Sequence, residues 1–114
     1  TFGGGPLVCR VALEFFEILD GLLPEMVKTG DYFRAQLQEL QQKYSFIKEV
    51  RGAGLMIGAE LDIPGGDMVL RGIESGLLFN CTHDTVLRFL PPYILKAKHV
   101  DRAMKVLDQI FARY

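Results

Sequence analysis

The sequence predicts an α+β domain in which a small, mainly antiparallel sheet has helices packed on one face. Apolar residues recur every three or four positions near both ends of the chain, which indicates amphipathic helices. Short segments rich in β-branched and apolar residues fill the middle, which indicates strands. The connections between these strands are of hairpin length, which favours antiparallel neighbours. The length of 114 residues suits one compact domain, so we expect a single unit over residues 1–114.

Two helices are expected in the first part of the chain. Pro6 suits the first position of a helix, where its missing N–H costs nothing. The apolar positions that follow at helical spacing are Leu7, Val8, Val11, Ala12, Phe15, Ile18, Leu19 and Leu22. Gly21 and Pro24 are expected to break or kink this helix. The apolar face of the second helix is formed by Met26, Phe33, Leu37, Leu40 and Tyr44. Gly30 lies on the same face, which indicates close packing against a neighbour.

Strands are expected where the helical spacing stops. The expected strands are residues 47–51, 55–61, 77–80 and 86–90. Between the second and third strands, Asp67 is a plausible N-cap for a short helix, and Gly76 is expected to end that helix in a left-handed conformation. Pro91 stops the last strand. A final helix is predicted by the clearest apolar stripe of the chain, formed by Val100, Ala103, Met104, Leu107, Ile110 and Phe111.

Composition and charge exclude several classes of protein. The composition is that of an ordinary globular domain, and a net charge of −1 provides no electrostatic footprint for nucleic acid or an anionic membrane. Carboxylates interrupt the longest apolar stretch, so no membrane span is expected. No signal-peptide pattern is present, and we expect a cytoplasmic protein with Cys9 and Cys81 as small, reduced core residues. The cysteines and histidines lack the spacing of metal ligands, so no metal site is expected. Because the chain begins with Thr1, we expect a piece of a longer protein.

The glycine-rich run before the first helix is one candidate site. Gly3, Gly4 and Gly5 let backbone N–H groups approach an anion closely, and the N-terminus of the following helix adds a favourable dipole. The hydroxyl of Thr1 can donate a further hydrogen bond to a phosphate oxygen. The run lacks the Gly-Lys-Ser/Thr of a nucleotide-binding loop, so a flexible lead-in to the helix is the alternative.

Arg88 is the second candidate, because it lies within an otherwise apolar strand. An ion cannot stay buried without a partner, since its desolvation costs roughly several kcal/mol. A buried Arg88 therefore needs a carboxylate from the protein or from a ligand, which a guanidinium can bind through two parallel hydrogen bonds. The alternative is that Arg88 projects outward from a half-exposed strand. The residues alone leave both interpretations open.

The remaining charged residues are expected to have no catalytic role. Arg51 precedes a glycine turn and is expected to form a surface or intradomain ion pair. Glu60 and Asp62 alternate on one strand and are expected to be solvated. No lysine lies in the apolar or positively charged setting that would lower its pKa for covalent chemistry. The sequence therefore contains no nucleophile with a base and an orienting group beside it.

Three segments resemble motifs of the class III aminotransferases. Residues 1–9, T-F-G-G-G-P-L-V-C, are similar to T-[FY]-G-G-N-P-L-A-[CS] of that family. Residues 50–58, V-R-G-A-G-L-M-I-G, are similar to its V-R-G-x-G-L-M-x-G. Residues 76–92 resemble the closing motifs of the branch of the family that acts on N-acetylornithine. The motifs stand in the family's order and span nearly the whole chain; Gly5 departs from them, because the family usually has Asn there.

The resemblance implies the C-terminal small domain of a fold type I, pyridoxal-phosphate-dependent aminotransferase, with residues 1–23 as a bridging helix from a missing large domain. It also implies a homodimer that transfers an amino group between N-acetylornithine and 2-oxoglutarate, a step of arginine biosynthesis. In the family, the lysine that binds the cofactor, the aspartate beneath the pyridine nitrogen and the main phosphate loop precede the segment present here. We therefore expect this chain alone to be inactive and not to hold the cofactor.

The site residues of the family can be carried over by position. Thr1 matches a threonine that reaches the cofactor phosphate of the neighbouring subunit, and Gly3 and Gly4 match glycines beside it. Arg88 matches an arginine that receives a substrate carboxylate and that can also pair with a glutamate of the large domain. Ornithine, succinylornithine and 4-aminobutyrate transaminases have similar closing motifs and are alternatives. A non-catalytic dimerisation or interaction module is the alternative from another class, against which Thr1 argues.

Overall fold

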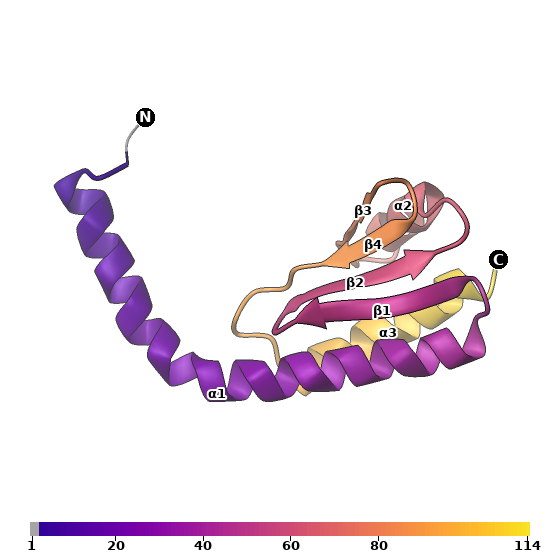
Figure 1. Cartoon of the computed structure of the whole chain (residues 1–114), viewed down its shortest axis with the longest axis horizontal. Coiled ribbons are helices and arrows are strands. Elements are labelled where there is room, and N and C mark those ends of the chain that lie inside the picture. Colours follow the sequence, from indigo (N-terminus) through magenta and orange to yellow (C-terminus); the bar gives the residue numbers. More distant parts are fainter. Residues whose placement is uncertain (1–2) are drawn as a thin grey trace.

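The computed structural model describes residues 3–114 as three helices and a four-stranded antiparallel sheet (Figure 1). The helices are α1 (Pro6–Lys43), α2 (Gly66–Glu74) and α3 (Ala97–Phe111). The strands are β1 (Ile47–Ala53), β2 (Met56–Leu61), β3 (Asn80–Thr82) and β4 (Val86–Phe89), in the spatial order β1-β2-β4-β3. Every neighbouring pair is antiparallel, which confirms the predicted fold class.

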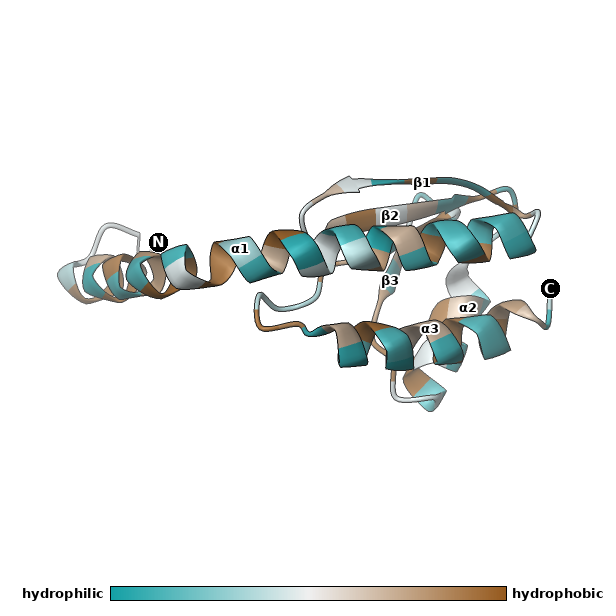
Figure 2. Cartoon of the chain, turned by 90° about the horizontal axis from the view of Figure 1, so that it is seen from below, coloured by the Kyte–Doolittle hydropathy of each residue, from teal (hydrophilic) through white to brown (hydrophobic). Residues whose placement is uncertain are grey.

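The helices cover one face of the sheet and leave the other open. α1 and α3 lie side by side against the sheet, and α2 packs against α3 and β3 (Figures 1 and 2). The buried strand residues alternate along β2 and β4 and are Ile57, Ala59, Leu61, Leu87 and Phe89. The predicted stripe of α3 meets them with Val100, Met104, Leu107, Ile110 and Phe111. Each large apolar side chain buried in this way contributes roughly 1.5–3 kcal/mol.

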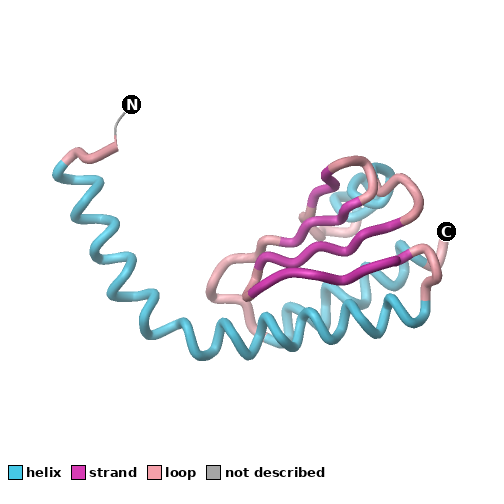
Figure 3. Tube along the Cα trace, viewed as in Figure 1, coloured by secondary structure: helices cyan, strands magenta, loops and turns pink. Residues whose placement is uncertain are grey.

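α1 is one helix rather than two. It continues through Gly21 and Pro24 and bends strongly along its length (Figure 3). Pro24 lies inside the helix, where its ring removes one backbone hydrogen bond and crowds the carbonyl of Asp20. The expected kink is therefore confirmed, whereas a separate second helix is wrong. We call residues 6–23 the arm of α1.

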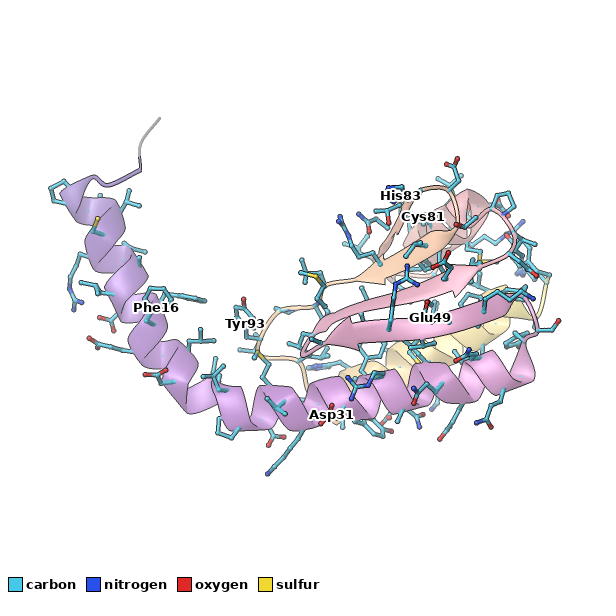
Figure 4. All side chains as sticks on the ribbon, viewed as in Figure 1. Phe16, Asp31, Glu49, Cys81, His83 and Tyr93 are labelled. Atoms are coloured by element: carbon cyan, nitrogen blue, oxygen red, sulfur yellow. The ribbon has the colours of Figure 1, made fainter. Side chains whose placement is uncertain are left out.

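The two parts of α1 differ in burial. The helix after Pro24 buries Phe33, Leu37 and Leu40 in the core, as predicted. The apolar stripe of the arm is exposed, and its exposed members are Leu7, Val8, Val11, Phe15 and Ile18. Phe15 contacts Tyr93 with ring centroids 5.9 Å apart, and Phe16 points into the concave side of the bend (Figure 4). Helical periodicity was therefore predicted correctly for the arm, but the described chain covers its apolar face only in part, at Leu19 and Leu22 and where Phe15 contacts Tyr93.

Gly30 has the close packing that its position predicts. A Cβ atom at Gly30 would lie 2.4 Å from the carbonyl oxygen of Gly54 and 2.8 Å from its carbonyl carbon. The backbone of α1 therefore lies directly against the turn between β1 and β2, at a distance that only glycine allows. This contact sets the position of that turn relative to the helix.

The end of α2 agrees with prediction, and its cap explains why β3 starts later than predicted. Gly76 adopts a φ of +74°, as expected, and its N–H donates to the carbonyl of Ile73. The N–H of Leu77 donates to the carbonyl of Gly72, so Leu77 completes the helix cap and is not available to a strand. β3 therefore begins at Asn80, not at residue 77. The N-cap of α2 is Gly65, and Asp67 lies in the first turn instead.

Candidate functional site

Arg88 lies on the open face of the sheet. Its neighbours Leu87 and Phe89 are buried towards the helices, so the alternation of β4 directs Arg88 to the opposite face, where it is exposed. Outward projection is confirmed, and burial within this domain is wrong. The Nε atom of Arg88 donates a hydrogen bond to Oδ1 of Asn80 over 3.1 Å. Within residues 3–114, no carboxylate lies at salt-bridge distance from Arg88.

The strand register places Arg88 in a row that crosses all four strands. We call this row, which consists of Arg51, Gly58, Arg88 and Asn80, the arginine row. Adjacent strands lie about 4.8 Å apart, so the backbones of Arg51 and Arg88 are separated by about 10 Å with only Gly58 between them. A hollow of about 430 Å³ lies over this glycine, and both arginines line it.

The two arginines of the row have different partners. Arg51 donates to Oε2 of Glu49 over 2.9 Å and to Oε2 of Glu60. The hydrogen bond to Glu60 raises the pKa of the Arg51 guanidinium above its usual value, and the attraction of both carboxylates adds to the rise. Arg51 is thus an intradomain ion-pair residue, as predicted. Arg88, in contrast, has among the described residues only the neutral amide of Asn80 as a partner, so its positive charge is available to a ligand.

Glu60 and Asp62 are paired rather than simply solvated. Glu60 accepts from Arg51, and Asp62 lies 2.6 Å from Nζ of Lys48. The side chains of Glu60 and Asp62 keep 40% and 46% of their exposure, so water still reaches both carboxylates. The expectation of solvation was therefore incomplete, because strand pairing brings a cation from β1 to each of them.

The glycine-rich run lies at the tip of the arm, away from the arginine row (Figure 1). Thr1, the predicted phosphate contact, lies outside the described residues. A Cβ atom added to Gly3 or Gly4 would meet nothing within 4 Å, and Gly4 has a φ of +80°. α1 follows from Gly5 without a side-chain cap, so the N–H groups of its first turn keep donor capacity. Open space and uncapped N–H donors fit the approach of a phosphate group.

The lysines of the chain are all exposed: Lys28, Lys43, Lys48, Lys96, Lys98 and Lys105. Lys43 donates to both carboxylate oxygens of Asp108, at 2.6 and 2.8 Å, and this hydrogen bonding raises the pKa of the lysine. Covalent catalysis by a lysine requires the opposite shift. Arg88 beside the hollow over Gly58 is thus the feature of the described residues that suits ligand binding.

Metal-binding groups, cysteines and membrane-spanning helices were the remaining features to locate within residues 3–114. Between residues 3 and 114, His, Cys, Asp and Glu side chains form no group of three that could hold a metal ion. Cys9 and Cys81 are free thiols; Cys9 is exposed, so its expected place in the core is wrong, and Cys81 is half-buried. No helix in the described part of the chain is long and apolar enough to cross a membrane.

Sequence reasoning missed Asn80 and Gly58 as members of the site. Asn80 holds Arg88, and Gly58 forms the floor of the hollow. A glycine inside a strand often marks a place where a ligand or another backbone approaches closely, and Gly58 carries that signal. Asn80 lies within the segment that resembles the family's closing motifs, but only the strand register shows that it faces Arg88.

Comparison with known proteins gives a family for this sequence. Residues 1–111 match the family model of the class-III aminotransferases. The acetylornithine aminotransferase of Methanocaldococcus jannaschii is 50% identical over 97% of this chain, and that of Aquifex aeolicus is 46% identical over 96%. The chain spans 28% of the length of each relative.

Solved structures agree with this assignment. An acetylornithine aminotransferase from Elizabethkingia anophelis superimposes with a TM-score of 0.89 and 27% identity, over 100% of this chain and 32% of that one. An ornithine aminotransferase from Toxoplasma gondii ME49 has a TM-score of 0.86 and 35% identity, over 99% of this chain and 28% of that one. Another structure of the Toxoplasma gondii enzyme shows partial occupancy of PLP at its active site. The sequence motifs, the fold and these likenesses agree, and the chain belongs to the class III aminotransferase family.

Proposed function

We propose that this chain is the C-terminal, substrate-binding part of an enzyme that transfers an amino group between N-acetylornithine and 2-oxoglutarate. Relatives at 50% and 46% identity that are named acetylornithine aminotransferases support the choice of substrate. The proposed site rests on Arg88, which is exposed beside a hollow and, within residues 3–114, hydrogen-bonded only to the neutral amide of Asn80. A guanidinium with this freedom suits a carboxylate, which both proposed substrates contain.

Arg88 has the geometry to hold such a carboxylate in a fixed orientation. Its Nε atom is bonded to Asn80 on β3, which leaves the two terminal nitrogens for a ligand. Two parallel hydrogen bonds from these nitrogens would fix both the position and the plane of a carboxylate. Holding one end of the substrate in this way places the reacting carbon, and such positioning can account for a large part of an enzyme's rate enhancement.

Pyridoxal phosphate, when bound, supplies the electron sink that amino-group transfer requires. The residues of this chain that would border its phosphate are Thr1, Gly3 and Gly4. Gly3 and Gly4 lie at the tip of the arm and Arg88 lies on the sheet (Figure 1), so within residues 3–114 one chain does not bring these glycines to Arg88. This separation supports a homodimer in which the glycine run of one subunit serves the site of the other. The free thiols fit a cytoplasmic enzyme, since that compartment keeps cysteines reduced.

The arm is proposed to bridge to a preceding large domain. Leu7, Val11 and Ile18 of the apolar stripe are 77%, 62% and 56% exposed, and a contiguous apolar surface of this kind usually marks an interface. Because the relatives are more than three times as long as this chain, the rest of such an enzyme is large enough to cover the arm. Residues 1–23 would then belong to the interface between the two domains.

Ornithine is the second candidate for the amino donor. The Toxoplasma gondii ornithine aminotransferase is 35% identical to this chain, more than the 27% of the Elizabethkingia acetylornithine enzyme. The two donors differ in the acetyl group on one amine, which removes a positive charge. Steady-state kinetics of the full-length enzyme with both donors decide between them, and a kcat/KM for ornithine at or above that for N-acetylornithine would reverse the choice.

Replacement of Arg88 by Lys in the full-length enzyme tests the site. Lysine keeps the positive charge but cannot form the two parallel, coplanar hydrogen bonds that a guanidinium forms with a carboxylate. In the complex, the guanidinium and the substrate carboxylate are shielded from water, so we expect kcat/KM for 2-oxoglutarate and glutamate to fall about 30-fold to several thousand-fold. The melting temperature and the cofactor absorbance should be preserved. Arg102→Lys, on the exposed side of α3, is the matched control. Near-normal kinetics of Arg88→Lys would rule out the assignment, and a lowered melting temperature with uniformly lowered activity would favour a structural role.

A further inference from the structure

Glu60 has two arginines as diagonal neighbours on the open face. On one side it is paired with Glu49 of β1, whose neighbour at i+2 is Arg51. On the other side it is paired with Val86 of β4, whose neighbour at i+2 is Arg88. Diagonal residues of adjacent antiparallel strands lie about 7–8 Å apart, which glutamate and arginine side chains can span. The sheet therefore allows Glu60 to pair with either arginine.

The structure shows one of these two pairings. Glu60 accepts a hydrogen bond from Arg51, and Glu49 fixes the same guanidinium at 2.9 Å. Arg88 is held from the opposite direction, because its partner Asn80 lies on β3, on the far side of β4 from Glu60. The carboxylate is thus drawn towards β1 and the second guanidinium towards β3, and the hollow over Gly58 lies beside Arg88.

We propose that Arg51 is a positioning residue that holds Glu60 away from Arg88, so that Arg88 is available to the substrate carboxylate. The proposal rests on the proposed function of Arg88. Without Arg51, Glu60 would turn to its other diagonal neighbour and compete with the substrate from within the chain. Arg51 itself would touch neither substrate nor cofactor.

The expected size of the effect follows from the strength of exposed ion pairs. For a well-placed exposed ion pair, the formed state is up to about five times as populated as the open state. If Glu60 pairs with Arg88 at a ratio of paired to open states between about one and five, the fraction of enzyme with a free Arg88 falls, and the apparent KM for 2-oxoglutarate rises about two- to sixfold. The turnover number should change by less than about twofold, because saturating substrate displaces the internal competitor.

The test is a double-mutant cycle at positions 51 and 60 in the full-length enzyme. The variants are Arg51→Gln, Glu60→Gln and the two together, and the measurements are KM and kcat for 2-oxoglutarate and the Kd of glutarate, an unreactive dicarboxylate, by calorimetry. We expect Arg51→Gln to raise KM and Kd about two- to sixfold, and the added Glu60→Gln change to remove that rise. Rescue of this kind separates competition from a structural defect, which a second substitution would not repair.

Two outcomes would overturn the proposal. An unchanged KM and Kd in Arg51→Gln would show that Glu60 does not compete for Arg88. An equal rise with and without Glu60 would show that Arg51 acts on the substrate or on the fold. Arg88→Lys, measured in the same series, separates this inference from the proposed function. If Arg88→Lys leaves KM unchanged, the proposed function fails; if it raises KM while Arg51→Gln does not, only the positioning role fails.

Discussion

Gly30 is the position in α1 where one added methyl group is expected to strain the fold beside the arginine row. The methyl carbon would lie 2.4 Å from the carbonyl oxygen of Gly54, whereas ordinary contacts of carbon lie at about 3.5–4.0 Å. Both atoms that it would meet first belong to the backbone, so no side chain can turn aside. The helix and the β1–β2 turn must therefore separate by about 1 Å, and Arg51 lies three residues before Gly54.

The magnitude follows from two opposing effects. Overpacking of this kind costs about 1–3 kcal/mol. Replacing glycine by alanine inside a helix contributes about 1 kcal/mol of helix propensity in the opposite direction. Gly21 lies in the same helix with nothing within 4 Å of its Cβ position, so Gly21→Ala has the second effect without the first. Gly30→Ala should therefore be about 1–3 kcal/mol less stable than Gly21→Ala, whatever the exact propensity.

Urea unfolding of the 114-residue chain, followed by circular dichroism, measures the difference. We expect the transition midpoint of Gly30→Ala to lie below that of Gly21→Ala, with similar slopes. The slope serves as a control, because a change in slope would mean that the folded or unfolded state had changed in compactness. A midpoint for Gly30→Ala equal to or above that of Gly21→Ala would refute the reasoning, since the helix and the turn would then separate without cost.

Three further outcomes are expected. The chain alone, mixed with pyridoxal phosphate and reduced with borohydride, should show no stoichiometric adduct on any lysine by mass spectrometry. A lysine that binds the cofactor covalently must be desolvated, and all six lysines are exposed. Thr1→Val in the full-length enzyme should weaken cofactor binding by about 1.5–3 kcal/mol, since the lost hydrogen bond has a charged acceptor; an unchanged cofactor dissociation constant would contradict it. The hydrogen bond from Lys43 holds the pKa of Asp108 below its usual value of 3.8. The stability from this lowered pKa is therefore present above 3.8 and lost as the pH falls through the lower folded value. Asp108→Asn should lower the urea midpoint of unfolding at pH 7, and the difference from the wild type should shrink as the pH falls below 3.8.

The elements that depend on local periodicity were predictable from the sequence. The apolar stripe of α3 follows from spacing alone and was found where expected, and the strands expected at residues 55–61 and 86–90 were found as Met56–Leu61 and Val86–Phe89. The continuity of α1 was not predictable, because the signals at Gly21 and Pro24 are consistent with either a break or a bend. A proline costs a helix one hydrogen bond and a local clash, and a bend relieves the clash while helix continues on both sides. Which outcome occurs depends on packing far from Pro24 in the sequence.

The sequence predicted individual residues of the candidate site but not how they are arranged around one another. A charge in an apolar strand and the family motif both pointed to Arg88, but its direction was left open. Arg51, Gly58 and Asn80 become its neighbours through three strand pairings, of which the pairing of Gly58 with Arg88 joins residues far apart in sequence. The register of a strand pair depends on which face of each strand is buried in the core, and the sequence alone left that face undetermined for β4. The role of Glu60 as a shared neighbour of two arginines follows from the same pairings.

The register that forms the core is also what keeps Arg88 on the open face. A slip of β4 by one residue would exchange the two faces, exposing Leu87 and Phe89 and turning Arg88 towards the helices. Each lost apolar burial would cost roughly 1.5–3 kcal/mol, and burying an unpaired guanidinium would cost roughly several more. The sum is a large fraction of the total stability of a domain, which is typically about 5–15 kcal/mol. Arg88 can therefore keep a charge without an internal counter-ion, because its direction is fixed by Leu87 and Phe89 rather than by a salt bridge of its own.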